Sequence, residues 1–192
     1  FDLVVAENGA LLYDPATKEQ KPLCEPPLPE FVAALQRRGA FPLSVGRTIV
    51  ATREPYEEAA LEVIRDLGLE LQVIFNKGAV MILPSGVNKA TGLKAALKEL
   101  KPPEHNIVGV GDAENDHAFL GICECAVAGA DALPALQEAA DFVTKATHGP
   151  GVTQLIEEML QDDLASREPA RRRRHIELGK SPHAWQPAPS PH

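Results

Sequence analysis

Apolar runs and amphipathic segments alternate along the chain, and the order in which they follow one another changes near its middle. In the first half, short apolar runs between turn-forming residues predict strands, and apolar side chains at helical spacing predict helices. The run over residues 2–6 is continuous, as in strands that are buried in a parallel sheet. Asn76-Lys77-Gly78 lies between two apolar runs and is typical of a hairpin turn. The predicted strands are residues 2–6, 11–14, 42–52, 71–75 and 79–83, and the predicted helices are 29–38, 55–67 and 89–100.

The second half follows a strict order of strand and helix. Such an order is typical of a parallel α/β sheet, whereas the first half predicts a mixed structure with antiparallel strands. We place the boundary between the two parts near Gly86–Lys89. Residues 161–192 contain many prolines and arginines and predict a solvated tail or a linker. In the second half the predicted strands are residues 106–112, 126–128 and 142–144, and the predicted helices are 115–120, 132–140 and 151–160.

The composition is that of a folded, acidic protein. The 192 residues carry a formal net charge of −8, and 44% of them are hydrophobic, which excludes a collagen-like or wholly disordered chain. The negative charge and an aromatic content of 5% argue against a nucleic-acid partner. The Arg171–Arg174 block could contact nucleic acid or an anionic surface, but a charged linker explains it better.

The apolar runs also bear on localisation. None approaches the roughly 18–20 residues that a membrane span requires. The first residues lack the basic flank and long apolar stretch of a secretory signal. We therefore expect a soluble, cytoplasmic protein with no membrane partner.

Oxygen-bearing side chains follow the predicted strand over residues 106–112. Asp112 ends this strand, and Asn115 and Asp116 come one turn later. Ligands of open α/β sheets bind beyond the carboxyl ends of the strands, and Mg²⁺ prefers oxygen ligands. The pattern indicates a Mg²⁺ site at Asp112 and Asp116. The alternative is an acidic first turn of a helix, which the helix dipole favours.

Lys89 stands at the start of a predicted helix. A fixed positive charge there could meet a phosphate or pair with a carboxylate of the site. A lone lysine in this position is otherwise a common surface residue, so only its combination with Asp112 and Asp116 makes it a candidate.

Two segments resemble motifs of a known family. Asn88–Leu93, followed about twenty residues later by Val110–Asp116, resembles the third and fourth motifs of haloacid dehalogenase-like phosphohydrolases. Glu7–Ala10 resembles the point at which the chain of one branch leaves the core for a large α/β cap. The resemblance implies an α/β fold with a Rossmann-like core and an α+β cap that has antiparallel strands. It divides the chain into a core strand at 1–8, a cap at 9–86, core with both motifs at 87–160, and a partly disordered tail at 161–192.

The resemblance also implies a reaction. Members hydrolyse phosphate monoesters through a covalent aspartyl-phosphate, and Mg²⁺ and a lysine neutralise the charge on the phosphoryl group. Lys89 would stabilise this group, and Asp112 would bind Mg²⁺ directly. Asp116, together with Asn115, would support the metal and Lys89.

The cap of this family selects the substrate. Arg47, on or beside a predicted cap strand, would therefore bind a carboxylate or phosphate of the substrate, and Arg53 is a second candidate. The alternative for both is an arginine of the cap surface. By analogy with the family we expect the partner to be a small phosphorylated metabolite, such as a sugar or glycerate phosphate.

One motif of the family is missing from these residues. The nucleophile and the general acid/base are two aspartates in an Asp-x-Asp motif, and no Asp-x-Asp occurs in the sequence. Its strand would stand in the middle of the core sheet, beside the strand that ends at Asp112. We therefore expect a fragment of a longer hydrolase, inactive by itself, whose sheet is completed by an upstream segment or by a second copy in a homo-oligomer. The alternative is a catalytically inactive module that binds a ligand or partner within a multidomain protein.

Overall fold

The computed structural model describes residues 1–101 and 107–165, and contacts divide the chain into two compact units. The first unit is Phe1–Lys101, and the second contains the described residues 107–165. Most of the predicted tail, with Arg171–Arg174, lies outside the described residues. The contact boundary falls after Lys101, and the division into cap and core near Gly86–Lys89 stays a prediction.

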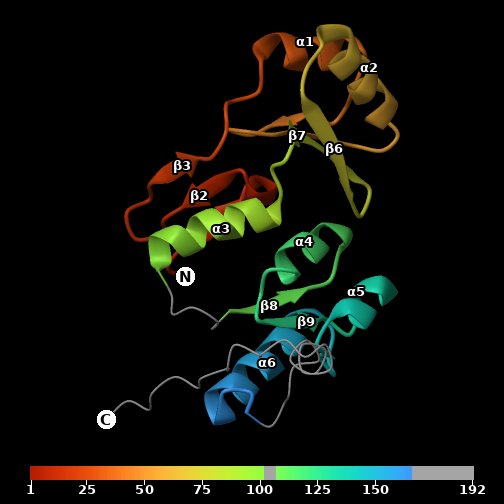
Figure 1. Cartoon of the computed structure of the whole chain (residues 1–192). Coiled ribbons are helices and arrows are strands. Elements are labelled where there is room, and N and C mark those ends of the chain that lie inside the picture. The colour runs from red at the N-terminus through yellow and green to blue at the C-terminus, as the bar shows by residue number, and fades with distance from the viewer. Residues whose placement is uncertain (102–106, 166–192) are drawn as a thin grey trace, which may run out of the picture. The chain divides into compact units, whose positions relative to one another are not determined.

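A small antiparallel sheet begins the first unit. It contains β1 (Val4–Ala6), β2 (Leu11–Tyr13) and β3 (Gln20–Pro22), in the order β1-β2-β3. The prediction that residues 2–6 form a parallel strand was wrong, because β1 pairs antiparallel with β2. The one-turn helix η1 (Glu7–Gly9) reverses the chain between them, with positive φ at all its residues. Helix α3 (Lys89–Leu100) lies along this sheet, as Figure 1 shows.

A second sheet of four strands forms the other part of this unit. Its order is β4-β5-β7-β6, and all neighbours are antiparallel. The hairpin around Asn76–Gly78 is confirmed, since Asn76 pairs with Ala79. Residues 42–52 were predicted as one strand but form two, which a turn at residues 46–49 separates. The strands are β4 (Ser44–Val45), β5 (Val50–Arg53), β6 (Leu71–Asn76) and β7 (Ala79–Pro84).

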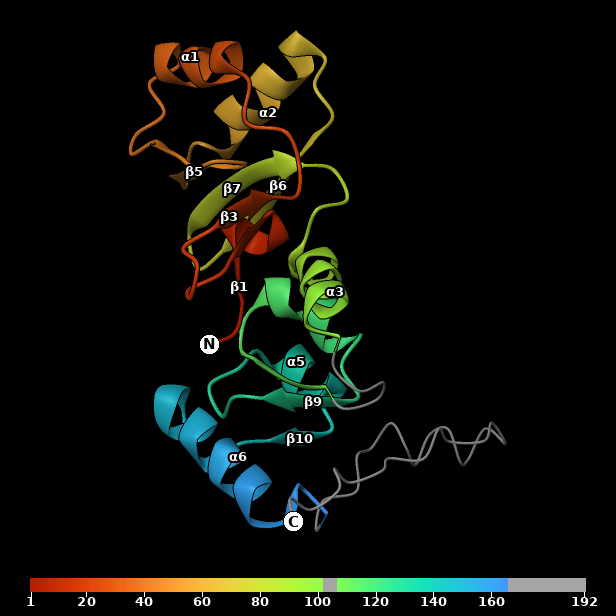
Figure 2. The ribbon, with the colours of Figure 1, turned by 90° about the vertical axis from the view of Figure 1, so that its left-hand side faces the viewer.

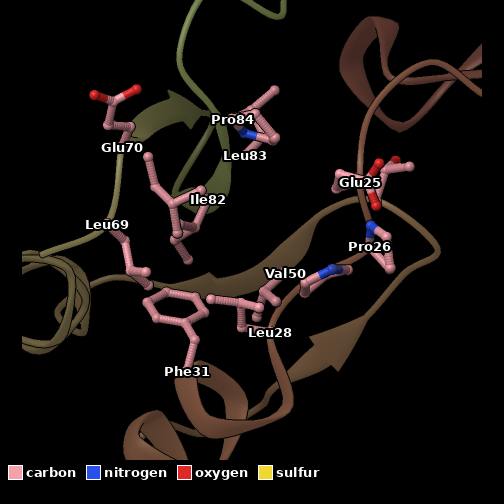
Figure 3. Close-up of a pocket in the computed structure, with 13 residues that line it drawn as sticks. Glu25, Pro26, Leu28, Phe31, Val50, Leu69, Glu70, Ile82, Leu83 and Pro84 are labelled. Atoms are coloured by element: carbon pink, nitrogen blue, oxygen red, sulfur yellow. The ribbon is translucent and has the colours of Figure 1, made fainter. Parts of the chain in front are cut away.

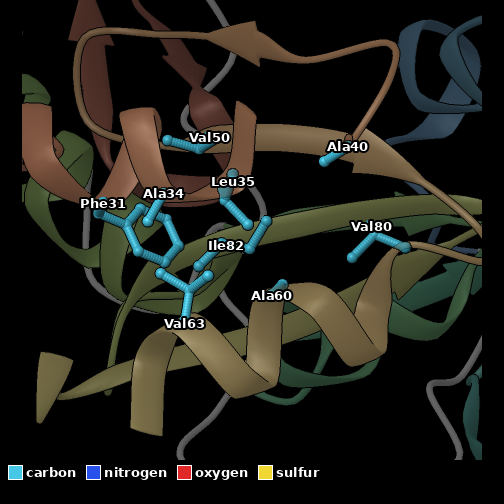
Figure 4. Packing of buried hydrophobic residues seen from close by; sticks show 9 residues of the cluster. All are labelled: Phe31, Ala34, Leu35, Ala40, Val50, Ala60, Val63, Val80 and Ile82. Atoms are coloured by element: carbon cyan, nitrogen blue, oxygen red, sulfur yellow. The ribbon is translucent and has the colours of Figure 1, made fainter. Parts of the chain in front are cut away.

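Two helices pack on this sheet. Helices α1 (Pro29–Arg37) and α2 (Glu57–Leu67) place their apolar stripes against β5 and β7. Phe31 and Leu35 of α1 meet Val63 of α2 and Ile82 of β7 in a closed apolar core (Figure 4). Gly68 ends α2 in the left-handed conformation, as its place in the sequence predicts.

The second unit contains the predicted parallel sheet. Strands β8 (Val108–Gly111), β9 (Cys125–Ala128) and β10 (Phe142–Val143) are parallel, with β9 in the middle. Side chains of β9 alternate between two apolar clusters: one includes helix α5 (Pro134–Ala139), and the other includes α6 (His148–Asp162). Figure 2 shows both helices beside the sheet. The short helices η2 (Glu114–Asp116) and α4 (His117–Leu120) connect β8 to β9.

The mixed α/β fold class, with a parallel sheet and antiparallel sheets, is confirmed. Within the described residues, the helices are too short or too polar to cross a membrane. Within the described residues, Cys24, Cys123 and Cys125 form no disulfide.

Candidate functional site

Asp112 lies at the carboxyl end of β8, the edge of a parallel sheet at which ligands bind. Its side chain is half-buried. Its carbonyl oxygen accepts a hydrogen bond from the N–H of Leu133 (3.2 Å), and the N–H of Gly129 donates to the oxygen of Gly111 (3.0 Å). The turn after β8 is therefore tied to the loop after β9, which fixes the backbone that carries Asp112.

The buried side chain of Asp116 stabilises the same turn through hydrogen bonds. Its side chain is only 3% exposed. Its Oδ2 accepts hydrogen bonds from the backbone N–H groups of Asp112 (2.9 Å) and Ala113 (3.0 Å). Asn115, which directly precedes Asp116 in η2, is half-buried. Asp116 thus fixes the direction in which the backbone presents Asp112, and its role as a metal ligand stays a prediction.

The donors of this turn suit Mg²⁺ by their chemistry. Asp112, Asn115 and Asp116 offer carboxylate and amide oxygens, which are hard ligands. One oxygen of Asp116 already accepts two backbone hydrogen bonds. Across residues 1–101 and 107–165, no three His, Cys, Asp or Glu side chains converge to hold a metal. The turn therefore supplies part of a coordination shell, and Mg²⁺ commonly takes one or two carboxylates and completes its shell with water and phosphate oxygens.

Asp131 and His148 lie at the same edge of the sheet, and sequence reasoning missed this pair. Nδ1 of His148 is 2.5 Å from Oδ2 of Asp131, and the N–H of His148 donates to Oδ1 (3.1 Å). A Cβ atom on Gly129 would lie 3.1 Å from Oδ1 of Asp131 and 3.8 Å from Cβ of Asp112, so both aspartates flank Gly129. The two partners stand on different loops, and no local pattern indicates that they meet.

Lys89 is the first residue of α3 in the other unit, and its side chain is half-buried. Asn88 caps the helix: its Oδ1 accepts hydrogen bonds from the N–H groups of Ala90 (2.9 Å) and Thr91 (3.0 Å). A lysine in the first turn opposes the helix dipole, so helix stability does not explain it. The lysine charge and the positive end of the helix dipole both favour an anion at this end of α3.

Arg47 lies in the turn between β4 and β5 and is exposed. Its backbone N–H donates to Oε1 of Glu7 (2.9 Å). The candidates thus fall into two groups, with Lys89 and Arg47 in the first unit and Asp112, Asn115 and Asp116 in the second. Glu7 was singled out in the sequence only as part of the exit toward the cap.

A hollow of about 260 Å³ opens in the first unit beside the linker that precedes α1. Phe31, Val50 and Ile82 form part of its wall, and Glu25 and Glu70 also line it (Figure 3). Its lining is mostly apolar, and its charged side chains are acidic. The hollow is therefore unsuited to a phosphate ester.

Similarity to known proteins decides the family. The sequence model of haloacid dehalogenase-like hydrolases matches residues 44–156, which is more than half of the chain. The chain belongs to this family. The chain is 33% identical over 121 residues to phosphoglycolate phosphatase 2 of Saccharolobus solfataricus, covering 63% of the chain and 51% of that relative. It is 30% identical over 161 residues to a phosphoglycolate phosphatase of Methanothermobacter thermautotrophicus, covering 80% and 70%. The chain thus spans about half the length of the first relative.

Solved structures show the same fold. A haloacid dehalogenase-like hydrolase from Bacteroides thetaiotaomicron superposes with a TM-score of 0.66 at 16% identity, covering 82% of this chain and 76% of that one. A subclass IIB sugar phosphatase of the superfamily gives a TM-score of 0.66 at 15% identity, covering 83% and 76%. The resemblance stated from the two sequence motifs is therefore confirmed at the level of family and fold.

Proposed function

We propose that this hydrolase supplies the cap, the lysine and the metal-binding turn of a Mg²⁺-dependent phosphatase that acts on a small phosphorylated carboxylic acid. The observation that carries the proposal is the turn after β8, in which buried Asp116 holds the backbone of Asp112 at the ligand-binding edge of the sheet. The names of two relatives, both phosphoglycolate phosphatases, support 2-phosphoglycolate as the substrate class.

Each candidate residue has a part in this proposal. Asp112 would hold Mg²⁺ through its carboxylate, with Asp116 as the predicted second ligand and as the group that orients it. The ion, when bound, supplies positive charge to the phosphoryl oxygens. Lys89 would donate hydrogen bonds to the same oxygens and would neutralise the charge that develops as the ester oxygen leaves. Arg47 would pair with the carboxylate of the substrate.

The attacking group is proposed to come from outside these residues. In the family that the two motifs resemble, an aspartate of an Asp-x-Asp motif attacks phosphorus, and the alcohol leaves with a proton. Water then releases phosphate from the aspartyl-phosphate. Because the 192 residues contain no Asp-x-Asp, turnover would need a protein in which this motif precedes the chain.

The test measures phosphate released from 2-phosphoglycolate in the presence of Mg²⁺ by a protein that adds an Asp-x-Asp strand before Phe1. We expect Asp112→Asn and Lys89→Met to lower kcat by about a hundredfold or more, because each removes a charge that acts on the transition state. Glu114→Gln, an exposed neighbour in the same turn, and Lys94→Met, on the exposed face of α3, are the matched controls. Full activity of Asp112→Asn would rule out the assigned metal site.

The alternative expected from the sequence is a module that binds a ligand without turnover. Binding and turnover of 2-phosphoglycolate distinguish this module from the phosphatase. Calorimetric binding of 2-phosphoglycolate by the 192-residue chain, together with no turnover by the longer protein, would support the module.

A further inference from the structure

Glu7 holds the turn that carries Arg47. Its Oε1 accepts a hydrogen bond from the N–H of Arg47 (2.9 Å). Its Oε2 accepts from the N–H of Thr48 (2.7 Å), from the N–H of Ile49 (3.2 Å) and from the hydroxyl of Thr48. One carboxylate, about 40 residues away in the chain, therefore satisfies three successive N–H groups of the turn between β4 and β5.

The surroundings of Glu7 are built for this contact. Glu7 and Asn8 both have φ in the left-handed region, at 49° and 54°, which residues other than glycine adopt only where the surroundings enforce it. A Cβ atom on Gly46 would lie 2.7 Å from Oε1 of Glu7, so only glycine lets the turn approach the carboxylate so closely. Thr48 is 2% exposed, so its hydrogen bonds to Glu7 are partly shielded from water, whereas the one from Arg47 is exposed.

The other side of η1 rests on the start of α3. A Cβ atom on Gly9 would lie 1.9 Å from the carbonyl oxygen of Asn88, the residue that caps α3 and precedes Lys89. Glu7 and Gly9 belong to the same three-residue turn. The start of α3 and the turn of Arg47 therefore both contact η1.

The guanidinium of Arg47 takes no part in the hydrogen bonds to Glu7. Glu7 accepts only from the backbone of Arg47, and in the described part of the chain no hydrogen bond or ion pair involves the guanidinium. The turn is therefore held in place while the positive end of Arg47 stays accessible to an anion.

We infer that Glu7 is a positioning residue that sets where Arg47 stands relative to Lys89, and so selects anions with two charged ends, such as a phosphorylated carboxylic acid. The inference rests on the proposed function, in which Lys89 meets the phosphate and Arg47 the carboxylate. Inorganic phosphate has no carboxylate, so its binding requires Lys89 but not Arg47.

The experiment compares the 192-residue chain with its Glu7→Gln variant by two measurements. Hydrogen exchange followed by NMR should show faster exchange at the amides of Arg47, Thr48 and Ile49, because a neutral amide replaces the charged acceptor. Calorimetry with Mg²⁺ present should show the Kd for 2-phosphoglycolate raised about tenfold, as expected for the loss of one charge-assisted contact, with the Kd for inorganic phosphate unchanged.

Matched variants separate positioning from general damage. Arg47→Ala should give the same loss of affinity for 2-phosphoglycolate, and the double variant with Glu7→Gln should lose little more. Thr48→Val removes one of the hydrogen bonds and keeps the shape, so it should fall between wild type and Glu7→Gln. Glu19→Gln and Arg37→Ala remove exposed charges of the same unit and should change neither measurement.

Each result has one meaning. Unchanged exchange at the three amides in Glu7→Gln overturns the inference, and so does faster exchange with the affinity for 2-phosphoglycolate retained. A wild-type chain that binds inorganic phosphate but not 2-phosphoglycolate overturns the proposed substrate and the role of Arg47 in it, while the exchange rates still decide whether Glu7 holds the turn.

Discussion

Glu7 and Asp116 are acidic residues whose carboxylates accept hydrogen bonds from backbone N–H groups. Glu7 accepts from three successive N–H groups of the turn 47–49, and Asp116 accepts from two successive N–H groups of the turn after β8. Hydrogen bonds to an ionised acceptor are roughly twice as strong as neutral ones. In each case the carboxylate fixes a turn that carries a candidate site residue, so its effect on function is indirect.

The charge of Glu7 makes part of the stability depend on pH. Burial raises the pKa of Glu7, but hydrogen bonds from the Thr48 hydroxyl and from the N–H groups of residues 47–49 lower it more, so the pKa lies below the ordinary 4.5. The folded protein therefore releases this proton at a lower pH than the unfolded chain does. The stabilisation is present in full above the unfolded-state pKa and is lost as the pH falls through the folded-state pKa.

We therefore expect the difference in unfolding free energy between wild type and Glu7→Gln to shrink as the pH falls below about 4.5. Urea unfolding of both proteins, at neutral pH and at several acidic values, measures this difference. Glu19→Gln controls for the loss of one exposed negative charge. A difference that stays constant or grows with falling pH would show that the carboxylate of Glu7 does not contribute through its charge.

Among the elements, the helices and the β6–β7 hairpin were predictable because their signals are local. Apolar spacing, glycine after α2 and the Asn76–Gly78 turn act over a few residues. The prediction of one strand over residues 42–52 was wrong because β-branched residues continue through the turn that separates β4 from β5. Strand β3 was missed because Gln20–Pro22 is exposed and has no apolar alternation. The contacts of Glu7 and of Asp131 with His148 were missed because each joins residues that are far apart in sequence.

The packing of α3 on η1 gives a prediction at the scale of elements. A Cβ atom on Gly92 would lie 2.5 Å from the Cα of Gly9 and 2.5 Å from Cγ1 of Val5. Alanine would improve the intrinsic helix propensity of α3 by about 1 kcal/mol. The contact is with backbone that cannot yield easily, so we expect Gly92→Ala to destabilise the protein by about 1–3 kcal/mol in urea unfolding. Lys98→Ala, at an exposed position of α3, should stay within about 0.5 kcal/mol of wild type. A Gly92→Ala protein as stable as wild type would mean that α3 can move away from η1.

At the scale of the whole molecule, the parallel sheet of the described residues has two edge strands, β8 and β10, and β8 is the one that leads into Asp112. Strand β8 pairs with β9 on one side, and no described strand pairs with its other side. An unpaired strand edge offers a row of N–H and C=O groups to any other strand. The family resemblance places the strand of the Asp-x-Asp motif beside β8, so this edge is where a longer protein would complete its sheet.

The open edge leads to a prediction about association. We expect the 192-residue chain to self-associate through β8, because strand pairing would satisfy the free backbone groups. Sedimentation should then give an average mass that rises above 20.6 kDa with concentration, and the amides of β8 should exchange more slowly in the associated state. A protein that adds the Asp-x-Asp strand before Phe1 should keep a constant mass, because the edge is already paired. A 192-residue chain that stays at 20.6 kDa at all concentrations would contradict association through the edge of β8. A longer protein that associates as strongly as the shorter one would place the contact on another surface.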